Sequence, residues 1–498
     1  MNFSRNTYVL YLGYWTLLAS LLGSSEVMFS QNPVERPQIF KEQPSVYSEY
    51  EPGAYAIVED IVIEGNRKTR RSIVLREMSL RAGDTLWLDQ LEDVLEEQRR
   101  ILLNTNLFAE AQLLVSTLDL KHKETILRAV VRERWYVYPA FDIDLADRNF
   151  NVWWTEGNRS LGRVNYELKL RHGNLTGRRD KLTFRFQVGY TRKYELKYEL
   201  PYIDKAQILG LEVGVLLDQN REWNTSTEDG RLQFYRSDTS NVLRRERYRV
   251  GLVLRPKIET YHSLRLERQN NQIDRTLAES VNPNFFGDER RKQHFFGLQY
   301  RFVNDKRDVR NFPLNGNRTT FVVEKLGFRS RDDLNRTNVS LQFDHFQPVG
   351  GKIFNLMTVA KVKTDLQRTQ VPFFNRESLG FQANFVRGYQ YYVADGLDYA
   401  FLKNTLRAKV LETRIRLPFV PYRRFSDVPM RLYLGAHGDV GGIHDPFDTP
   451  GNVLANRFLT SYGAGAYAVL WYGKVIHFEM TRNDLGEWGG YFGFSLEF

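Results

Sequence analysis

The chain contains no cysteine among its 498 residues. This absence excludes disulfides, thiolate metal sites and a lipid-modified N-terminal cysteine. Beyond the N-terminus, nowhere do about 18 apolar residues run together, which is the length that a membrane-spanning helix needs. The low mean hydropathy of −0.47 points the same way, so a helical membrane protein is excluded. A β-barrel is still compatible, because lipid-facing and lumen-facing residues alternate along its strands.

No sequence motif of catalysis is present. There is no Gly-x-Ser-x-Gly elbow, no His-Glu-x-x-His pair and no phosphate-binding glycine loop. We therefore expect neither an enzyme nor a bound cofactor or metal ion. The chain has eight His residues and 60 Asp and Glu residues, so a catalytic triad assembled from distant positions is the alternative.

The net charge is positive but dispersed. Seventy Lys and Arg against 60 Asp and Glu give a formal net charge of +10. Nucleic acid is not the expected partner, since the basic residues are spread along the chain rather than gathered in one patch. Attraction to anionic lipid head groups, or a hydrated positive lumen, accounts for the excess more simply. Aromatic residues make up 14% of the chain, and such rings gather at membrane interfaces.

The N-terminus predicts export. Arg5 supplies a positive charge, an apolar stretch runs from Tyr8 to Leu22, and small residues follow, as in a secretory signal peptide. We assign residues 1–30 to this signal peptide, with cleavage after Ser30 or near Gly23–Ser25; a membrane anchor is the other interpretation. Residues 31–53 hold four of the sixteen prolines and no periodicity, so they are expected to form a linker.

Residues 54–135 predict a small α/β domain. A strand is expected from Ala54 to Asn66, and a first helix after Thr69 as its cap. A second helix is expected from Leu86 to Leu103, where apolar residues recur close to helical spacing. Two further strands, Ala111–Leu118 and Thr125–Arg132, complete the order strand, helix, helix, strand, strand.

From Tyr136 onward the spacing of apolar residues changes to a period of two. In "RVNYELKLR", Val164, Tyr166, Leu168 and Leu170 alternate with polar residues that point to the other face. One such segment is equally typical of a soluble sandwich with one wet face. Many successive segments with a charged face favour a barrel around a water-filled lumen. We therefore assign residues 136–498 to a transmembrane β-barrel.

The last segment, "YFGFSLEF", is interpreted as the closing strand of that barrel. The residues on one of its faces are Phe492, Phe494, Leu496 and Phe498. An aromatic terminus on an exposed soluble edge would invite aggregation, whereas in a closing barrel strand it lies at the lipid interface.

Several segments resemble the BamA and TamA superfamily of outer-membrane assembly and secretion factors. Its members join periplasmic POTRA (polypeptide-transport-associated) modules to a sixteen-stranded antiparallel barrel. The POTRA-like pieces are "IVIEGNRKT", "RAGD" and "LLNTNLFAEAQL", and the barrel-like pieces are "HGNLTGRRDKL", "YELPYI" and "NDKRDVRNFPLNGN". The resemblance covers nearly everything after Ala54. It implies one βααββ POTRA domain followed by a barrel of sixteen strands.

The most specific piece is "LGFQANFVRGY" (Leu379–Tyr389), here called the VRGY loop. It is similar to a family loop that inserts into the barrel lumen and docks on the inner wall. Its tip consists of Val386, Arg387, Gly388 and Tyr389. The resemblance implies that Arg387 pairs with carboxylates of the following strands, where the sequence offers Glu412 and Asp439. A planar guanidinium can hold one carboxylate through two hydrogen bonds and still reach a second. The alternative is an exposed loop arginine.

The period of two places Asp439 on an inner face independently of the family. In "RLYLGAHGDV", Leu434 and Val440 share the outer face, which leaves Asp439 with His437 on the inner one. Around Glu412 the alternation slips, because two apolar residues are adjacent. A β-bulge there would restore the register and turn Glu412 inward.

The function implied by the resemblance is an outer-membrane factor of a Gram-negative bacterium that inserts, assembles or translocates other proteins. The POTRA domain would lie in the periplasm, and the partners would be outer-membrane lipids, client polypeptides and accessory envelope proteins. The implied mechanism uses a weak seam between the first barrel strand, near Tyr136–Asp147, and the last, Tyr491–Phe498. A single POTRA domain leaves three alternatives: a dedicated secretion channel, a passive pore, and a structural accessory subunit.

Overall fold

The computed structural model describes residues 53–204, 206–257, 259–351, 353–381, 384–416, 427–447, 449, 451–470 and 474–495. The predicted signal peptide (1–30) and all but the last residue of the predicted linker (31–53) lie outside this part, so both stay predictions. By its internal contacts the chain divides into two units. One unit holds the chain up to Asp142 together with Leu168–Arg185 and Leu196–Ile203; the other holds the rest.

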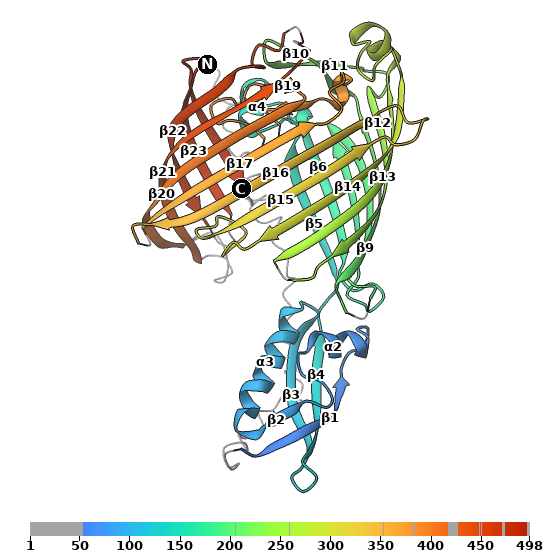
Figure 1. The fold of residues 1–498 in the computed structure, drawn as a ribbon, viewed down its shortest axis with the longest axis vertical. Helices are drawn as coiled ribbons and strands as arrows, with labels where there is room; N and C mark the ends of the chain where they lie inside the picture. The colour runs from blue at the N-terminus through green and yellow to red at the C-terminus, as the bar shows by residue number, and fades with distance from the viewer. Residues whose placement is uncertain are drawn as a thin grey trace, which may run out of the picture. The chain divides into compact units, whose positions relative to one another are not determined.

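The expected N-terminal α/β domain is a four-stranded sheet with two helices (Figure 1). Its elements are β1 (Tyr55–Glu64), α2 (Arg71–Glu77), β2 (Thr85–Trp87), α3 (Leu91–Asn104), β3 (Phe108–Asp119) and β4 (Glu124–Glu133). The strand order is β2-β1-β4-β3, with β1 and β4 parallel and the other pairs antiparallel. Leu95 and Leu102 of α3 pack with Ile61 and Leu127 of the sheet in one buried core. The amphipathic helix is therefore stabilised by burying its apolar face on the sheet.

Two details of this domain differ from the prediction. The second helix begins at Leu91 rather than Leu86, because Thr85–Trp87 pairs with β1 as a short strand and Leu88–Gln90 forms a 3₁₀ turn. Thr69 does not cap the first helix, whose N-cap is Arg70 without a side-chain hydrogen bond. The Thr69 hydroxyl is buried and lies 3.0 Å from the hydroxyl of Tyr136. Both differences arise from tertiary contacts that local spacing does not encode.

The rest of the described chain builds one antiparallel sheet of sixteen strands, as predicted. These are β5 (Val137–Leu145), β6 (Val164–His172), β7 (Lys181–Gly189), β8 (Thr191–Leu200), β9 (Leu209–Asn220), β12 (Leu243–Leu254), β13 (Thr260–Ile273), β14 (Lys292–Asp305), β15 (Gly316–Leu326), β16 (Arg336–Val349), β17 (Phe354–Asp365), β20 (Asp398–Arg416), β21 (Asp427–His444), β22 (Phe458–Val469), β23 (Val475–Asn483) and β24 (Trp488–Ser495). Each strand neighbours the next one along the chain, and β5 and β24 stand at the two ends of the order. The sheet is thus a continuous meander.

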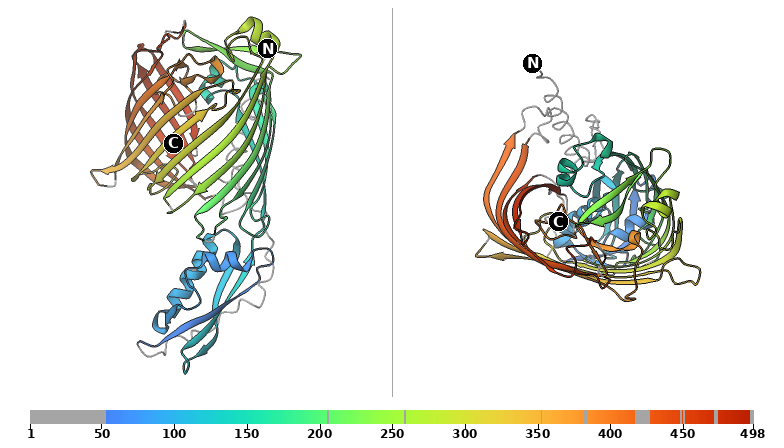
Figure 2. Two further views of the ribbon diagram at one scale, coloured as in Figure 1. Left: turned by 45° about the vertical axis from the view of Figure 1, so that its right-hand side comes forward. Right: turned by 90° about the horizontal axis from the view of Figure 1, so that it is seen from above.

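Shorter elements lie in the connections between these strands. They are α4 (Phe150–Thr155), η4 (Leu161–Arg163), β10 (Glu222–Glu228), β11 (Arg231–Arg236), η5 (Leu277–Val281), η6 (Phe373–Asn375), β18 (Glu377–Leu379) and β19 (Ala394–Gly396). β10 pairs with β11 and β18 pairs with β19 as separate two-stranded sheets. Seen from above, the strands of the large sheet curve round, and the segment that joins β17 to β20 folds inside the curve (Figure 2).

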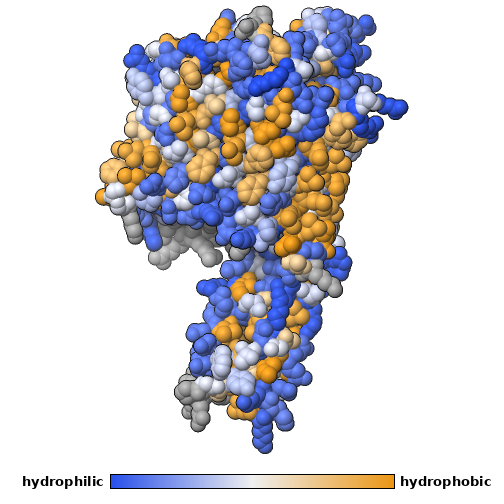
Figure 3. Space-filling model, in the orientation of Figure 1, coloured by the Kyte–Doolittle hydropathy of each residue, from blue (hydrophilic) through white to orange (hydrophobic). Residues whose placement is uncertain are grey.

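The two faces of the large sheet differ in polarity. On β12, Val250 and Leu252 are exposed, and apolar side chains gather over the strands on the outer surface (Figure 3). On the opposite face, Arg249 of the same strand pairs with Glu267 of β13 at 2.6 Å. A sheet with an apolar outer face and an ion-paired inner face has the mean hydropathy of a soluble protein, as in membrane barrels. Among the residues described, no helix is long and apolar enough to cross a membrane.

We predict that Gly65→Ala destabilises the N-terminal domain more than Gly83→Ala does. Both glycines have positive φ, +86° and +93°, so alanine costs about 1–2 kcal/mol of backbone strain at either position. At Gly65 a Cβ would also lie 1.9 Å from the carbonyl oxygen of Val131, whereas at Gly83 it would meet nothing within 4 Å. Hydrogen exchange of β1 and β4 in the full-length protein measures the difference. Equal losses of protection in the two variants would contradict the packing argument.

Candidate functional site: an arginine buried against three strands

The VRGY loop lies between β18 and β19, whose pairing closes it at its base. Tight turns shape it: the N–H of Asn384 donates to the carbonyl of Phe381 at 3.0 Å, and the N–H of Tyr389 to that of Val386 at 3.2 Å. Buried apolar residues of the loop and of the surrounding strands form one cluster: Leu379, Val386, Tyr389, Ala394, Tyr399, Phe401, Ile443, Leu454 and Leu459. Apolar packing on β20 and β21 therefore positions the tip of the loop.

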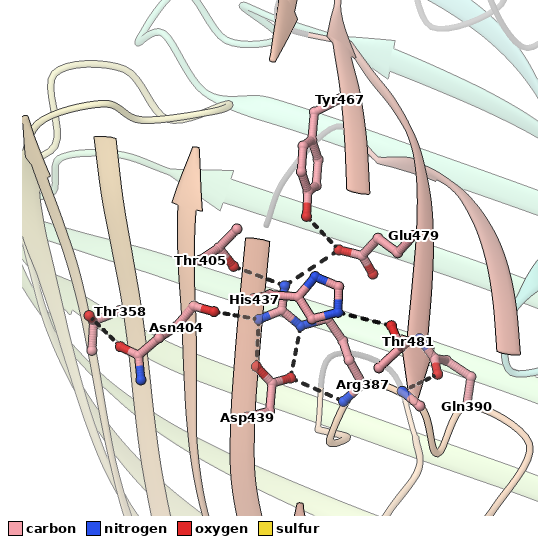
Figure 4. A network of polar contacts seen from close by, with 11 residues as sticks. Thr358, Arg387, Gln390, Asn404, Thr405, His437, Asp439, Tyr467, Glu479 and Thr481 are labelled. Carbon is pink, nitrogen blue, oxygen red and sulfur yellow. Dashed lines mark hydrogen bonds and ion pairs between the residues drawn. The ribbon is translucent and has the colours of Figure 1, made fainter. Parts of the chain in front are cut away.

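The Arg387 guanidinium uses all five of its N–H donors (Figure 4). Its Nε and Nη2 donate to Asp439 Oδ2 at 2.8 Å and Oδ1 at 2.5 Å, a bidentate pair. Nη1 donates to Thr405 Oγ1 at 2.9 Å and reaches Glu479 Oε1 at 3.4 Å. Nη2 also donates to the carbonyl of Asn404 at 3.1 Å. A guanidinium has no further donor to satisfy, so the site is complete for arginine and incomplete for lysine.

The charges of this site are almost fully removed from solvent. The side chains of Arg387, Asp439 and Glu479 are 6%, 0% and 8% exposed. Lys403, which faces Asp439 in the β20–β21 register, adds a second cation, so two cations face two carboxylates. Removing one member of such a buried set strands a charge, at a cost of about 3–5 kcal/mol. Within the described ranges, no group of His, Cys, Asp and Glu is placed to hold a metal ion.

The inner face of β21 is the one that the sequence predicts. Tyr433, His437 and Asp439 are buried, while Leu434 and Val440 on the other parity are exposed. His437 packs two residues before Asp439, with Nε2 2.9 Å from Thr481 Oγ1 of β23. The predicted inward orientation of Asp439 is confirmed, and its carboxylate pairs with Arg387.

Glu412 does not reach Arg387, and the expectation of a second partner there was wrong. The predicted bulge is present, between Lys409 and Leu411. However, Glu412 faces Arg431 in the β20–β21 register, eight residues along β21 from Asp439, which is about 26 Å at 3.3 Å per residue. Its side chain is 60% exposed and pairs with Lys409 at 2.8 Å. Parity alone could not place Glu412 at the right height.

Glu479 of β23 takes the place that was assigned to Glu412. Its Oε1 lies 3.4 Å from Arg387 Nη1 and also accepts a hydrogen bond from the hydroxyl of Tyr467 at 2.8 Å. The sequence carries a signal for it that was not used. In "VIHFEMTRN", Phe478 and Met480 are exposed, so Glu479 falls between them on the inner face.

Gly388 and Tyr389 fix the tip beyond the arginine. Gly388 has φ +84°, and its carbonyl accepts hydrogen bonds from Asn483 Nδ2 and from the hydroxyl of Tyr491, both at 3.1 Å. These donors lie on β23 and β24, so the tip contacts the last two strands of the sheet. The ring of Tyr389 is buried in the apolar cluster, 6.1 Å from that of Tyr392.

A second buried arginine, which sequence analysis did not single out, lies on the same strand as Thr405. Arg407 donates through Nη2 to the carbonyl of Pro313 at 2.8 Å and stacks over the ring of Phe312, 4.3 Å from its centroid. Phe312 belongs to the turn between β14 and β15, part of the segment "NDKRDVRNFPLNGN". Its ring lies 4.7 Å from that of Tyr433 and 6.4 Å from that of Tyr467. The turn is therefore packed against the tyrosine that bonds Glu479.

The segment after β5 binds the other side of the loop. Arg148 Nη1 donates to the carbonyls of Gly380 at 2.9 Å and Tyr392 at 3.0 Å, and Nη2 to that of Tyr391 at 3.2 Å. Burial lowers the pKa of Arg148 to about 10, so the guanidinium keeps its charge at neutral pH. Arg148 therefore holds the segment between β18 and β19 by carbonyl groups on both sides of the VRGY tip.

Of the segment predicted as the closing strand, Tyr491–Ser495 belong to β24, which stands at one end of the strand order. Phe492 is half-buried and Phe494 exposed, while Tyr491 on the other parity is buried. Leu496 and Phe498 lie outside the described residues, so their placement stays a prediction.

We predict that Asp439→Asn and Glu479→Gln release the VRGY loop, while Glu412→Gln does not. Asp439→Asn removes the bidentate partner and strands the buried arginine, at a cost of about 3–5 kcal/mol of docking free energy. Glu479→Gln costs less, about 1–2 kcal/mol, because its contact is longer and an amide oxygen still accepts from Tyr467. Hydrogen exchange of residues 384–393 reports docking, and conductance in planar bilayers should rise with undocking. Unchanged exchange in Asp439→Asn would contradict the assignment.

Gly388→Ala should also loosen the loop, with Tyr389→Phe as its control. An alanine Cβ at position 388 would lie 3.1 Å from Thr481 Cγ2, 3.3 Å from Asn483 Cβ and 3.5 Å from Ser461 Cβ, at a positive φ. The strain of about 1–2 kcal/mol adds to this crowding. The Tyr389 hydroxyl has no hydrogen-bond partner among the described residues, so its loss should leave loop exchange unchanged. Faster loop exchange in Tyr389→Phe than in Gly388→Ala would count against this account.

Two family models match the sequence. The Omp85 superfamily domain matches residues 174–465, more than half of the chain. The POTRA model, described as a surface antigen variable number repeat, matches residues 56–134. No curated protein matches.

Solved structures of low sequence identity are similar to this chain, and the first of them shares its fold. The crystal structure of BamA from Haemophilus ducreyi lacking POTRA domains 1–3 is 14% identical, with a TM-score of 0.63 over 88% of this chain and 83% of its own. CdiB from Acinetobacter baumannii is 13% identical (TM-score 0.49; 89% and 73% covered), and CdiB from Escherichia coli 14% (0.44; 97% and 94%). Together with the one POTRA repeat and the sixteen-stranded sheet, the match to the superfamily domain means that the chain belongs to the Omp85 superfamily of outer-membrane protein assembly and secretion factors.

Proposed function

We propose that the protein resides in the outer membrane of a Gram-negative bacterium, with its POTRA domain in the periplasm, and inserts, assembles or translocates other polypeptides there. Three observations support this proposal: membership of the Omp85 superfamily, the apolar outer face of the large sheet, and one POTRA repeat at the N-terminal side. An aqueous inner face lined by ion pairs suits a polypeptide path, since it offers hydrogen-bonding groups in place of lipid.

The working part of this proposal is a seam between β5 and β24. These strands stand at the two ends of the strand order, so each presents one edge that no other strand of that order covers. A strand edge carries unpaired N–H and C=O groups, and an incoming strand satisfies both at once by β-augmentation. The step needs no nucleotide and no catalytic residue.

The observation that carries the proposal is the docked Arg387. Two buried carboxylates and all the N–H donors of the Arg387 guanidinium hold this loop against β20, β21 and β23. The same tip contacts β24 through the Gly388 carbonyl, which accepts from Tyr491. We infer that the loop sets the position of the last strands, and so the state of the seam.

A dedicated secretion channel is the second candidate, because the superfamily comprises secretion factors as well as assembly factors. The edge strands of the POTRA sheet, β2 and β3, would bind such a partner by β-augmentation.

We expect depletion of the protein in its native host to remove outer-membrane proteins, as measured by comparing outer-membrane proteomes. Loss of many barrels would identify a general assembly factor, and loss of a single protein a dedicated exporter. Complementation with Glu412→Gln should restore the proteome, whereas Asp439→Asn should not, because Asp439 pairs with Arg387 and Glu412 pairs with Lys409 instead. A proteome unchanged by depletion would refute both versions of the proposal.

A further inference from the structure

A side chain from outside the sheet bonds the edge of β24 that faces away from β23. Asn151, in the short helix α4, donates from Nδ2 to the carbonyl of Phe492 at 3.2 Å. In return, the N–H of Phe492 donates to Asn151 Oδ1 at 3.1 Å. Asn151 is buried, although it lies in a connection between strands. Both backbone groups of Phe492 are thus satisfied by one carboxamide from a residue 341 positions away in sequence.

This pair of bonds reproduces what a neighbouring strand would supply. In an antiparallel sheet, a hydrogen-bonded pair exchanges both N–H···O=C bonds, and successive residues point them to alternate sides. A carboxamide carries one carbonyl acceptor and N–H donors, the same groups as a peptide unit. In the strand order β24 has β23 as its one neighbour, where Phe492 faces Phe478. Asn151 therefore stands where the next strand would pair.

The residues around Asn151 hold it in this position. Asn149 caps α4, accepting from the N–H of Val152 at 2.9 Å, and donates to the carbonyl of Gln390 at 3.1 Å. The ring of Phe150 packs edge-on against that of Phe492, 5.4 Å between centroids. Arg148 adds its three bonds to carbonyls in the VRGY loop, at Gly380, and just after it, at Tyr391 and Tyr392. The Asn151 carboxamide is therefore carried by a segment, residues 148–152, that is itself hydrogen-bonded to the region of the VRGY loop.

We propose that Asn151 is a removable cap on the β24 edge, and that an extended polypeptide strand pairs with β24 at Phe492 by displacing it. The inference rests on the proposed seam and adds what closes it at rest. An extended peptide is the occupant that fits, because the edge presents one donor and one acceptor at strand spacing and is already filled by a peptide-like group. A lipid acyl chain would leave both groups of Phe492 without a partner.

The cap is tested in the full-length protein with a labelled synthetic peptide of the sequence WGGYFGFSLEF, which is that of Trp488–Phe498, as a model strand. Asn151→Ala should bind this peptide about tenfold more tightly than the natural protein, the factor expected when a competitor held by two ordinary hydrogen bonds is removed. Asn151→Asp should also bind more tightly, since it lacks the donor and sets a carboxylate against the Phe492 carbonyl. Thr155→Val is the control: it removes a hydroxyl that bonds only the Asn151 carbonyl.

Hydrogen exchange without peptide separates uncapping from unfolding. In Asn151→Ala, exchange within Trp488–Ser495 should accelerate while that of β22 and β23 stays unchanged, and added peptide should restore protection. Equal affinity of the natural protein and both Asn151 variants, or no binding to any of them, would overturn the proposal, as would unchanged exchange at β24. That failure is distinct from failure of the proposed function, which the outer-membrane proteome after depletion decides.

Discussion

A buried guanidinium with every donor satisfied is the constraint on which the rest of this site depends. A charge removed from water must find full compensation, because an unpaired buried cation costs several kcal/mol. Arg387 meets that demand where Asp439, Glu479, Thr405 and the Asn404 carbonyl converge. These ion pairs and hydrogen bonds fix the tip of the loop on the inner face of the sheet.

The sequence predicts which face of the sheet a residue occupies much better than it predicts which residues of neighbouring strands lie beside it. Alternation of apolar residues correctly turned Asp439 inward, and it would have turned Glu479 inward by the same rule. It failed for Glu412, where even the bulge was as expected. Side chains alternate between the two faces at every second residue, so the local sequence is enough to predict the face. The position of a residue beside the neighbouring strands depends on the register across several strands, which the alternation does not specify.

Other contacts leave no local pattern at all. Arg407 stacking on Phe312, and Asn151 pairing with Phe492, join segments that are distant in the chain and use backbone carbonyls that any residue could supply. Similarly, β2 forms because Thr85–Trp87 pairs with β1, although the spacing of apolar residues predicted a helix from Leu86. The architecture was readable from periodicity and from the resemblance to a family. The contacts that hold connections onto the sheet were not.

The loop and the cap are linked through shared partners, and linkage works in both directions. Arg387 fixes the tip of the loop, and the Gly388 carbonyl of that tip accepts a hydrogen bond from Tyr491 of β24. Arg148 joins the start of the loop to the segment that carries Asn151. If loop docking strengthens the cap, a strand that displaces Asn151 must weaken loop docking by the same free energy. An incoming strand would then loosen the element that holds β23 and β24 in place. Pairing at one edge residue is in this way coupled to the state of the inner wall.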